Sequence, residues 1–128
     1  MARDRLITVA AGPADESVLV AELTGAAVIV DALFGIGLTR PLEPPYPRWI
    51  ELMNAAPAVR VAADVPSGLD ADSGRSRPVA VRADVTAAMG FVKQGCRSPA
   101  GSAYSGRIVE IDIGLPSAIH SRFRSAPG

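Results

Sequence analysis

The sequence has little cysteine, histidine and aromatic residue content, and it has no excess of charge of either sign. The 128-residue sequence holds one cysteine and one histidine, and aromatic residues make up only 5% of it. A lone cysteine excludes an internal disulfide and a cysteine-based zinc cluster, because both need several thiols at defined spacings. Thirteen basic residues balance thirteen acidic ones. A net charge of zero predicts no general attraction to nucleic acid or to an anionic membrane surface.

Long hydrophobic runs are also missing from the sequence. No stretch approaches the roughly 18 apolar residues that a membrane-spanning helix needs. Residues 1–5 lead into a short strand-like run rather than into the longer apolar segment of a secretory signal. Together with the lone cysteine, these absences favour a reducing compartment, and we expect a cytoplasmic protein with one hydrophobic core.

What the sequence does contain is an alternation of short apolar runs with amphipathic segments. Strands are expected at residues 6–10, 26–30, 59–63, 84–89 and 107–113, and helices at residues 16–23, capped by Asp15, and 48–55. The run at 26–30 (AAVIV) is apolar throughout, which is typical of a strand covered by helices on both faces. The order strand, helix, strand, helix, strand predicts a parallel α/β sheet of Rossmann-like character.

The first of two chemically rich turns covers residues 31–41 (DALFGIGLTRP). Gly35 and Gly37 allow positive φ angles and a close approach of the backbone, so that its N–H groups can hold phosphate oxygens. Arg40 can add charge-assisted contacts. A GxG pattern also forms ordinary tight turns, and Asp31 can serve as a cap, so both interpretations stay open at this point.

The second turn covers residues 64–74 (DVPSGLDADSG). Asp64 directly follows a buried strand, where partial desolvation favours proton transfer, while Pro66 and Gly68 fix a sharp turn that presents Ser67. The alternative is an Asx-type turn in which Asp64 caps backbone N–H groups. Because ligands of open α/β sheets bind beyond the carboxyl ends of the strands, both turns are expected at one site. Oxygens of Asp31 and Ser67, with loop carbonyls, can hold a hard cation there.

Taken together, the two turns resemble the NAD(P)H-hydrate epimerase family, the YjeF N-terminal domain, in which a DALFGTGL-like turn precedes a DIPSG-like turn. The resemblance covers roughly residues 26–116, including ADVT at 83–86, Lys93 and Gly95, and the closing DIGLP at 112–116. It implies a Rossmann-like three-layer α/β/α fold with a mainly parallel sheet. It also implies an isomerase that interconverts the R and S hydrates of NADH and NADPH, after which a partner dehydratase restores the cofactors.

The resemblance assigns roles to matched positions. Asp31 and Ser67 are the implied ligands of a potassium ion, and Asp64 is the implied acid/base catalyst, in contact with the hydrated nicotinamide. Lys93 matches a family lysine and is a further candidate for the pocket, although an exposed loop lysine is the commoner case. The residues implied to contact the nucleotide are Gly35, Ile36, Gly37, Leu38, Thr39, Arg40 and Pro41.

The chain departs from the family pattern at two places. Ile36 stands where the family usually has threonine, and the family's GNNGGDG-like motif has no counterpart in residues 1–30. We therefore expect a partial domain at residues 1–116, truncated on its N-terminal side, followed by a C-terminal tail at residues 117–128. Exposed strand edges in a reduced sheet favour a homodimer. A non-catalytic nucleotide-binding or self-associating scaffold domain stays open as the alternative to the epimerase.

Overall fold

The computed structural model describes residues 15–124, so the strand expected at residues 6–10 lies outside the described residues. A four-stranded sheet forms the centre, with its strands in the spatial order β1-β2-β3-β4 and every neighbouring pair parallel. The strands are β1 (Val28–Asp31), β2 (Val59–Ala63), β3 (Val85–Met89) and β4 (Arg107–Ile111). The parallel α/β architecture expected from the sequence is confirmed.

Five helices accompany the sheet in the described part of the chain: α1 (Glu16–Gly25), α2 (Tyr46–Ala55), α3 (Gln94–Arg97), α4 (Ser102–Ser105) and α5 (Ser117–Arg124). Asp15 caps α1 as expected, because its carboxylate accepts the backbone N–H of Ser17. The helix α2 begins two residues earlier than expected, since a proline is compatible with the first helical turn. Most of the predicted C-terminal tail is the helix α5.

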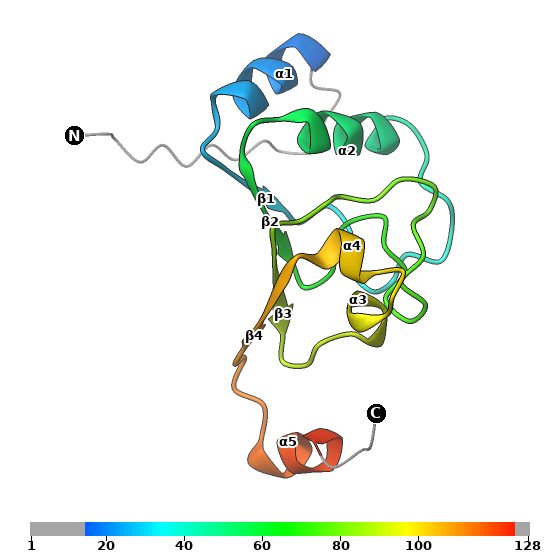
Figure 1. Cartoon of the computed structure of the whole chain (residues 1–128), viewed down its shortest axis with the longest axis vertical. Helices are drawn as coiled ribbons and strands as arrows, with labels where there is room; N and C mark the ends of the chain where they lie inside the picture. Colours follow the sequence, from blue (N-terminus) through cyan, green and yellow to red (C-terminus); the bar gives the residue numbers. More distant parts are fainter. Residues whose placement is uncertain (1–14, 125–128) are drawn as a thin grey trace, which may run out of the picture.

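The hydrophobic core lies on one face of the sheet. Ile29 of β1 packs with Ile50 and Met53 of α2 in one buried cluster. A second cluster joins Val65 and Leu69, from the loop after β2, to Cys96 of α3 and other residues. In Figure 1, α2, α3 and α4 lie on the same side of the sheet, which agrees with this distribution of buried side chains.

The opposite face of the sheet is apolar but uncovered by any described helix. Side chains alternate between the two faces along each strand, and the strand register aligns them across the sheet. None of the apolar side chains on this face is buried, and Val28 and Val30 are 55% and 62% exposed. The face contains Arg107 at the start of β4 and the apolar residues Val28, Val30, Val59, Val61, Ala63, Val85, Ala87, Met89, Val109 and Ile111. We call it the open face.

The open face corrects one expectation from the sequence. The strand expected at residues 26–30 was predicted to be covered on both faces, yet β1 alternates between exposed and buried positions. A continuously apolar run indicates that both faces have low polarity, but it does not reveal whether a second layer is present to cover them. Of the three layers expected, the described residues form two.

The carboxyl ends of the four strands meet at one edge of the sheet, because all the strands are parallel. Asp31 is the last residue of β1, and Asp64 directly follows β2. The two turns chosen from the sequence therefore start side by side, where ligands of open α/β sheets bind. Within residues 15–124, no helix has the length and apolar character needed to span a membrane.

Candidate functional site

Asp31 and Ser67 join the two turns through a buried pair of hydrogen bonds. The backbone N–H of Ser67 donates to Oδ2 of Asp31 at 2.7 Å, and its hydroxyl donates to Oδ1 at 2.5 Å. The hydroxyl oxygen also accepts the backbone N–H of Phe34, at 2.9 Å. Asp31 is 0% and Ser67 1% exposed. These contacts hold the start of the first turn against the second.

Burial raises the pKa of the Asp31 carboxyl, and the hydrogen bonds from Ser67 and Leu33 oppose that rise. The carbonyl oxygen of Phe34 lies 3.4 Å from Oγ of Ser67, so carboxylate, hydroxyl and carbonyl oxygens converge at one point. In residues 15–124, no group of three or more histidine, cysteine, aspartate or glutamate side chains is arranged to hold a metal ion. One carboxylate with neutral oxygens is a donor set suited to a weakly held monovalent cation.

Asp64 lies beside Lys93, and the ammonium group of Lys93 forms an ion pair with its Oδ1. The same carboxylate oxygen accepts the backbone N–H of Met89 at 3.0 Å, and Lys93 also donates to the carbonyl of Met89 at 3.1 Å. Asp64 is the one non-glycine residue with positive φ, 71°, in the described part of the chain. The contacts from β3 and the segment after it thus fix the direction of this carboxylate.

The glycines of the first turn do not have the conformation expected for them. Neither Gly35 nor Gly37 is among the residues with positive φ. A Cβ atom added at either position would meet nothing within 4 Å. The space beside these glycines is open. Their lack of a side chain therefore provides room for a ligand here, and not an unusual φ angle. The loop at residues 35–41, hereafter the glycine loop, is exposed along most of its length.

Two open cavities border the glycine loop, each with a volume of about 470 Å³. The first lies between the glycine loop and the second turn, and we call it the cleft. It is lined by Ile36, Leu38, Thr39, Asp70, Ala71, Asp72, Arg77 and Lys93. The second lies between the glycine loop and α2, with Arg40, Pro41 and Tyr46 among its lining residues. All seven candidate nucleotide-contacting residues line one of these cavities, whereas Asp64 borders the cleft only through its partner Lys93.

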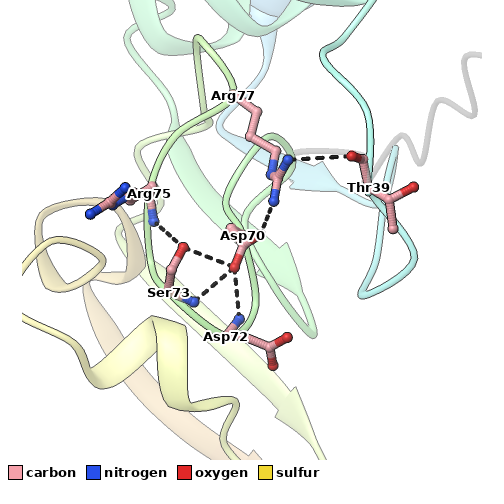
Figure 2. Close-up of polar contacts among 6 residues, drawn as sticks. All are labelled: Thr39, Asp70, Asp72, Ser73, Arg75 and Arg77. Atoms are coloured by element: carbon pink, nitrogen blue, oxygen red, sulfur yellow. Dashed lines mark hydrogen bonds and ion pairs between the residues drawn. The ribbon is translucent and has the colours of Figure 1, made fainter.

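Asp70 and Arg77 line the cleft as an ion pair that sequence reasoning did not single out (Figure 2). Oδ1 of Asp70 accepts two hydrogen bonds from Ser73 and one from the backbone N–H of Asp72. These contacts hold the pKa of Asp70 well below its usual range, with the backbone N–H of Ser73 as the largest cause and Arg77 next. The available signal for Asp70 was the polar DADS segment, because an aspartate in such a loop can accept the backbone N–H two residues on, as in an Asx turn.

Comparison with known proteins gives a consistent result. Residues 5–95 match the family described as "YjeF-related protein N-terminus". NAD(P)H-hydrate epimerases from Elusimicrobium minutum and Limosilactobacillus fermentum are 41% and 46% identical to the chain over 95 and 90 residues. The bifunctional NAD(P)H-hydrate repair enzyme Nnr of Pyrobaculum aerophilum is 47% identical over 91 residues.

These alignments cover 74%, 70% and 71% of the chain. They cover 42% and 43% of the two epimerases and 18% of the bifunctional protein. The chain therefore spans less than half the length of these curated relatives. Both turns lie inside the matched residues, and so do Asp70, Arg77 and Lys93.

Proposed function

Because the chain belongs to the family of YjeF-related protein N-termini, we propose that it is an isomerase that interconverts the R and S hydrates of NADH and NADPH. The observation that carries the proposal is the junction of the two turns. Hydrogen bonds between Asp31 and Ser67 hold the glycine loop and the Asp64 turn together at the carboxyl edge of the sheet. This arrangement supports a proposed division of roles, in which the open glycine loop binds phosphates and the Asp64 carboxylate, oriented by Lys93, transfers protons.

The glycine loop is proposed to bind the phosphates of the nucleotide. Its exposed backbone and the open space at Gly35 and Gly37 allow a ligand to approach the peptide N–H groups directly. Arg40 lines the cavity on the α2 side of the loop and supplies a positive charge there. Fixing the phosphates orients the distant nicotinamide ring without taking part in its chemistry.

Asp64 is the proposed proton-transfer group. Epimerisation leaves the covalent formula of the substrate unchanged, so a carboxylate that takes a proton and returns one needs no further reactant. Lys93 and the backbone N–H of Met89 hold Oδ1 of Asp64, which leaves Oδ2 free of any described hydrogen bond. An oriented base with one uncommitted oxygen is the geometry that general acid/base catalysis requires.

Potassium is the proposed cofactor, with Asp31 and Ser67 as its ligands. Support comes from the donor set, which combines one buried carboxylate with the hydroxyl of Ser67 and the carbonyl of Phe34. When bound, the ion would supply positive charge next to the turn that carries Asp64.

The deciding experiment follows the conversion of R-NADPH hydrate into the S form by chiral separation. Asp64→Asn keeps the size of the side chain and removes its proton-transfer capacity, and we expect turnover to fall by about 100-fold or more. Glu22→Gln, which removes one carboxylate from α1, is the matched control and should retain the wild-type rate. Equal rates for wild type and Asp64→Asn would refute the assigned role, and an inactive wild type would refute the enzyme.

Partners are proposed on separate grounds. An NAD(P)H-hydrate dehydratase is the proposed functional partner, because an epimerase of this kind needs an enzyme that removes one of its two epimers.

A second copy of the chain is the proposed physical partner, since the open face presents apolar side chains on all four strands. Two such faces can stack about 10 Å apart, as sheets do in sandwiches. Self-association without turnover would favour the scaffold alternative.

The cytoplasm remains the proposed location. Cys96 is a free cysteine with 1% of its surface exposed, which is compatible with a reducing compartment. Detection of the native protein in a cytosolic fraction, free of membrane and secreted material, is the direct check.

A further inference from the structure

Few hydrogen bonds tie the glycine loop to the rest of the described chain, although Leu38 packs against the buried cluster that contains Ile29 and Ile50. No backbone–backbone hydrogen bond between residues 15 and 124 reaches residues 35–41. Of the hydrogen bonds that involve side chains, one reaches the loop, from Nη1 of Arg77 to the carbonyl of Thr39 at 3.4 Å. Besides the packing of Leu38, the contact that ties the loop to the opposite wall of the cleft therefore comes from Arg77, which lies 38 positions away from Thr39 in the sequence.

Arg77 is itself held in a fixed position. Its Nη2 forms the ion pair with Oδ2 of Asp70, while the other oxygen of Asp70 is occupied by donors from Asp72 and Ser73. Figure 2 shows the guanidinium between Asp70 on one side and Thr39 on the other. The side chains of Asp70 and Arg77 are 16% and 33% exposed, so solvent reaches the pair only in part. The planar guanidinium can hold a carboxylate and a carbonyl at once, which a lysine ammonium does with less directional control.

We propose that Arg77, held by Asp70, is a positioning residue that fixes the glycine loop for the phosphates of a dinucleotide. The proposal rests on the function proposed above and goes beyond it by assigning the Asp70–Arg77 pair to nucleotide binding. Arg77 and Thr39 line the same cleft, so the contact sets the distance between its two walls. A loop that is already ordered loses less conformational entropy when the ligand binds.

Affinity for NADPH, measured by titration of its fluorescence, provides the first test. We expect Arg77→Ala to raise the Kd about tenfold, as expected for loss of a hydrogen bond from a charged donor. Arg77→Lys should recover part of the affinity, and Asp70→Asn should weaken it because Arg77 loses its charged partner. Arg75→Ala is the matched control, since it removes the same charge two residues away in the same loop and Figure 2 shows its side chain directed away from Thr39.

Backbone order parameters of residues 35–41, measured by 15N relaxation, provide a second test, which needs no ligand. The order parameters should fall in Arg77→Ala and Asp70→Asn but not in Arg75→Ala, while those of β4 stay unchanged in all three. If wild type fails to bind NADPH, the proposed phosphate-binding role of the loop fails, and the order parameters still decide the positioning role. Unchanged loop order parameters in Arg77→Ala, or equal losses of affinity in Arg77→Ala and Arg75→Ala, would overturn the inference. Should Arg77→Ala not fold, Arg77→Lys and Asp70→Asn carry the same comparison.

Discussion

Lys93 forms an ion pair with Asp64, although the two residues lie 29 positions apart in the sequence. Lys93 is the only lysine in the chain. Its ammonium group also donates to the carbonyl of Met89 at the end of β3, so it bridges the carboxyl edge of the sheet and the proposed catalytic carboxylate. Through this contact Lys93 can fix the direction of the Asp64 carboxylate. The role of Lys93 in the pocket stays a prediction.

We predict that Lys93→Gln lowers the epimerisation rate by about 10- to 100-fold, because Asp64 loses the donor that fixes its direction. Lys93→Arg should recover part of the rate, since it keeps the charge. The measurement is kcat and KM separately, and the loss should fall mainly on kcat. Arg97→Gln removes an exposed charge from the nearby α3 and should leave kcat unchanged. A Lys93→Gln enzyme with the wild-type kcat would contradict the prediction.

The Asp31–Ser67 junction predicts a loss of stability in Ser67→Ala. The variant removes a donor to Asp31 and an acceptor for the backbone N–H of Phe34, both in a buried setting. We expect the free energy of unfolding to fall by about 2–3 kcal/mol, measured by urea denaturation. Replacing tetramethylammonium chloride by potassium chloride should stabilise wild type more than Ser67→Ala if the two residues hold potassium. If the change of salt stabilises wild type and Ser67→Ala equally, the assignment of potassium to Asp31 and Ser67 is wrong.

The sequence was sufficient for the order and type of the main elements. The strand at 59–63 has the predicted bounds, and β1 ends at Asp31, one residue beyond the strand predicted at 26–30. Both results follow from apolar runs that end in polar turn residues, a local pattern that tertiary contacts do not alter. The exposure of Val28 and Val30 could not be predicted, because it depends on which layers are present around the sheet rather than on the strand itself.

Part of the candidate site was also predictable from local sequence patterns at the ends of strands. Asp31 ends β1, and Asp64 and Ser67 lie in the turn after β2, so parallel topology alone brings them to one edge. Arg77 and Asp70 lie within a long loop, and their contact with Thr39 depends on how that loop folds back. No periodic pattern encodes such a contact, so no feature of the sequence pointed to Arg77.

Gly68 and Gly37 should respond differently to substitution by alanine. Gly68 has φ +88°, and an added Cβ would collide with the backbone of Val79 and Ala80. Gly68→Ala is therefore expected to destabilise the fold by about 3 kcal/mol or more. Gly37→Ala meets open space and should keep the wild-type stability while weakening NADPH binding. Thermal unfolding and NADPH titration test both variants, and comparable stability losses would contradict this account.

Asp70 predicts a specific dependence of stability on pH. Its pKa is lowered in the folded state, so its contribution to stability is complete above the unfolded pKa of about 3.9 and is lost as pH falls toward the lower folded value. Asp70→Asn should be less stable than wild type at pH 7, and the difference should shrink below about pH 4. Urea denaturation at pH 7, 5, 4 and 3 measures this difference. A constant difference down to pH 3 would show that the charge of Asp70 is not its cause.

The open face predicts a dimer that a single charge can prevent. Val28 on this face and Val18 on α1 are both 55% exposed, so Val28→Lys and Val18→Lys add the same charge at equal exposure but in different places. If two sheets stack through the open face, Val28→Lys buries an unpaired ammonium group in the interface, at a cost that no salt bridge offsets. Sedimentation velocity should then find wild type and Val18→Lys as dimers at micromolar concentration and Val28→Lys as a monomer. A monomeric wild type, or equal dissociation of the two variants, would mean that a second copy does not cover this face.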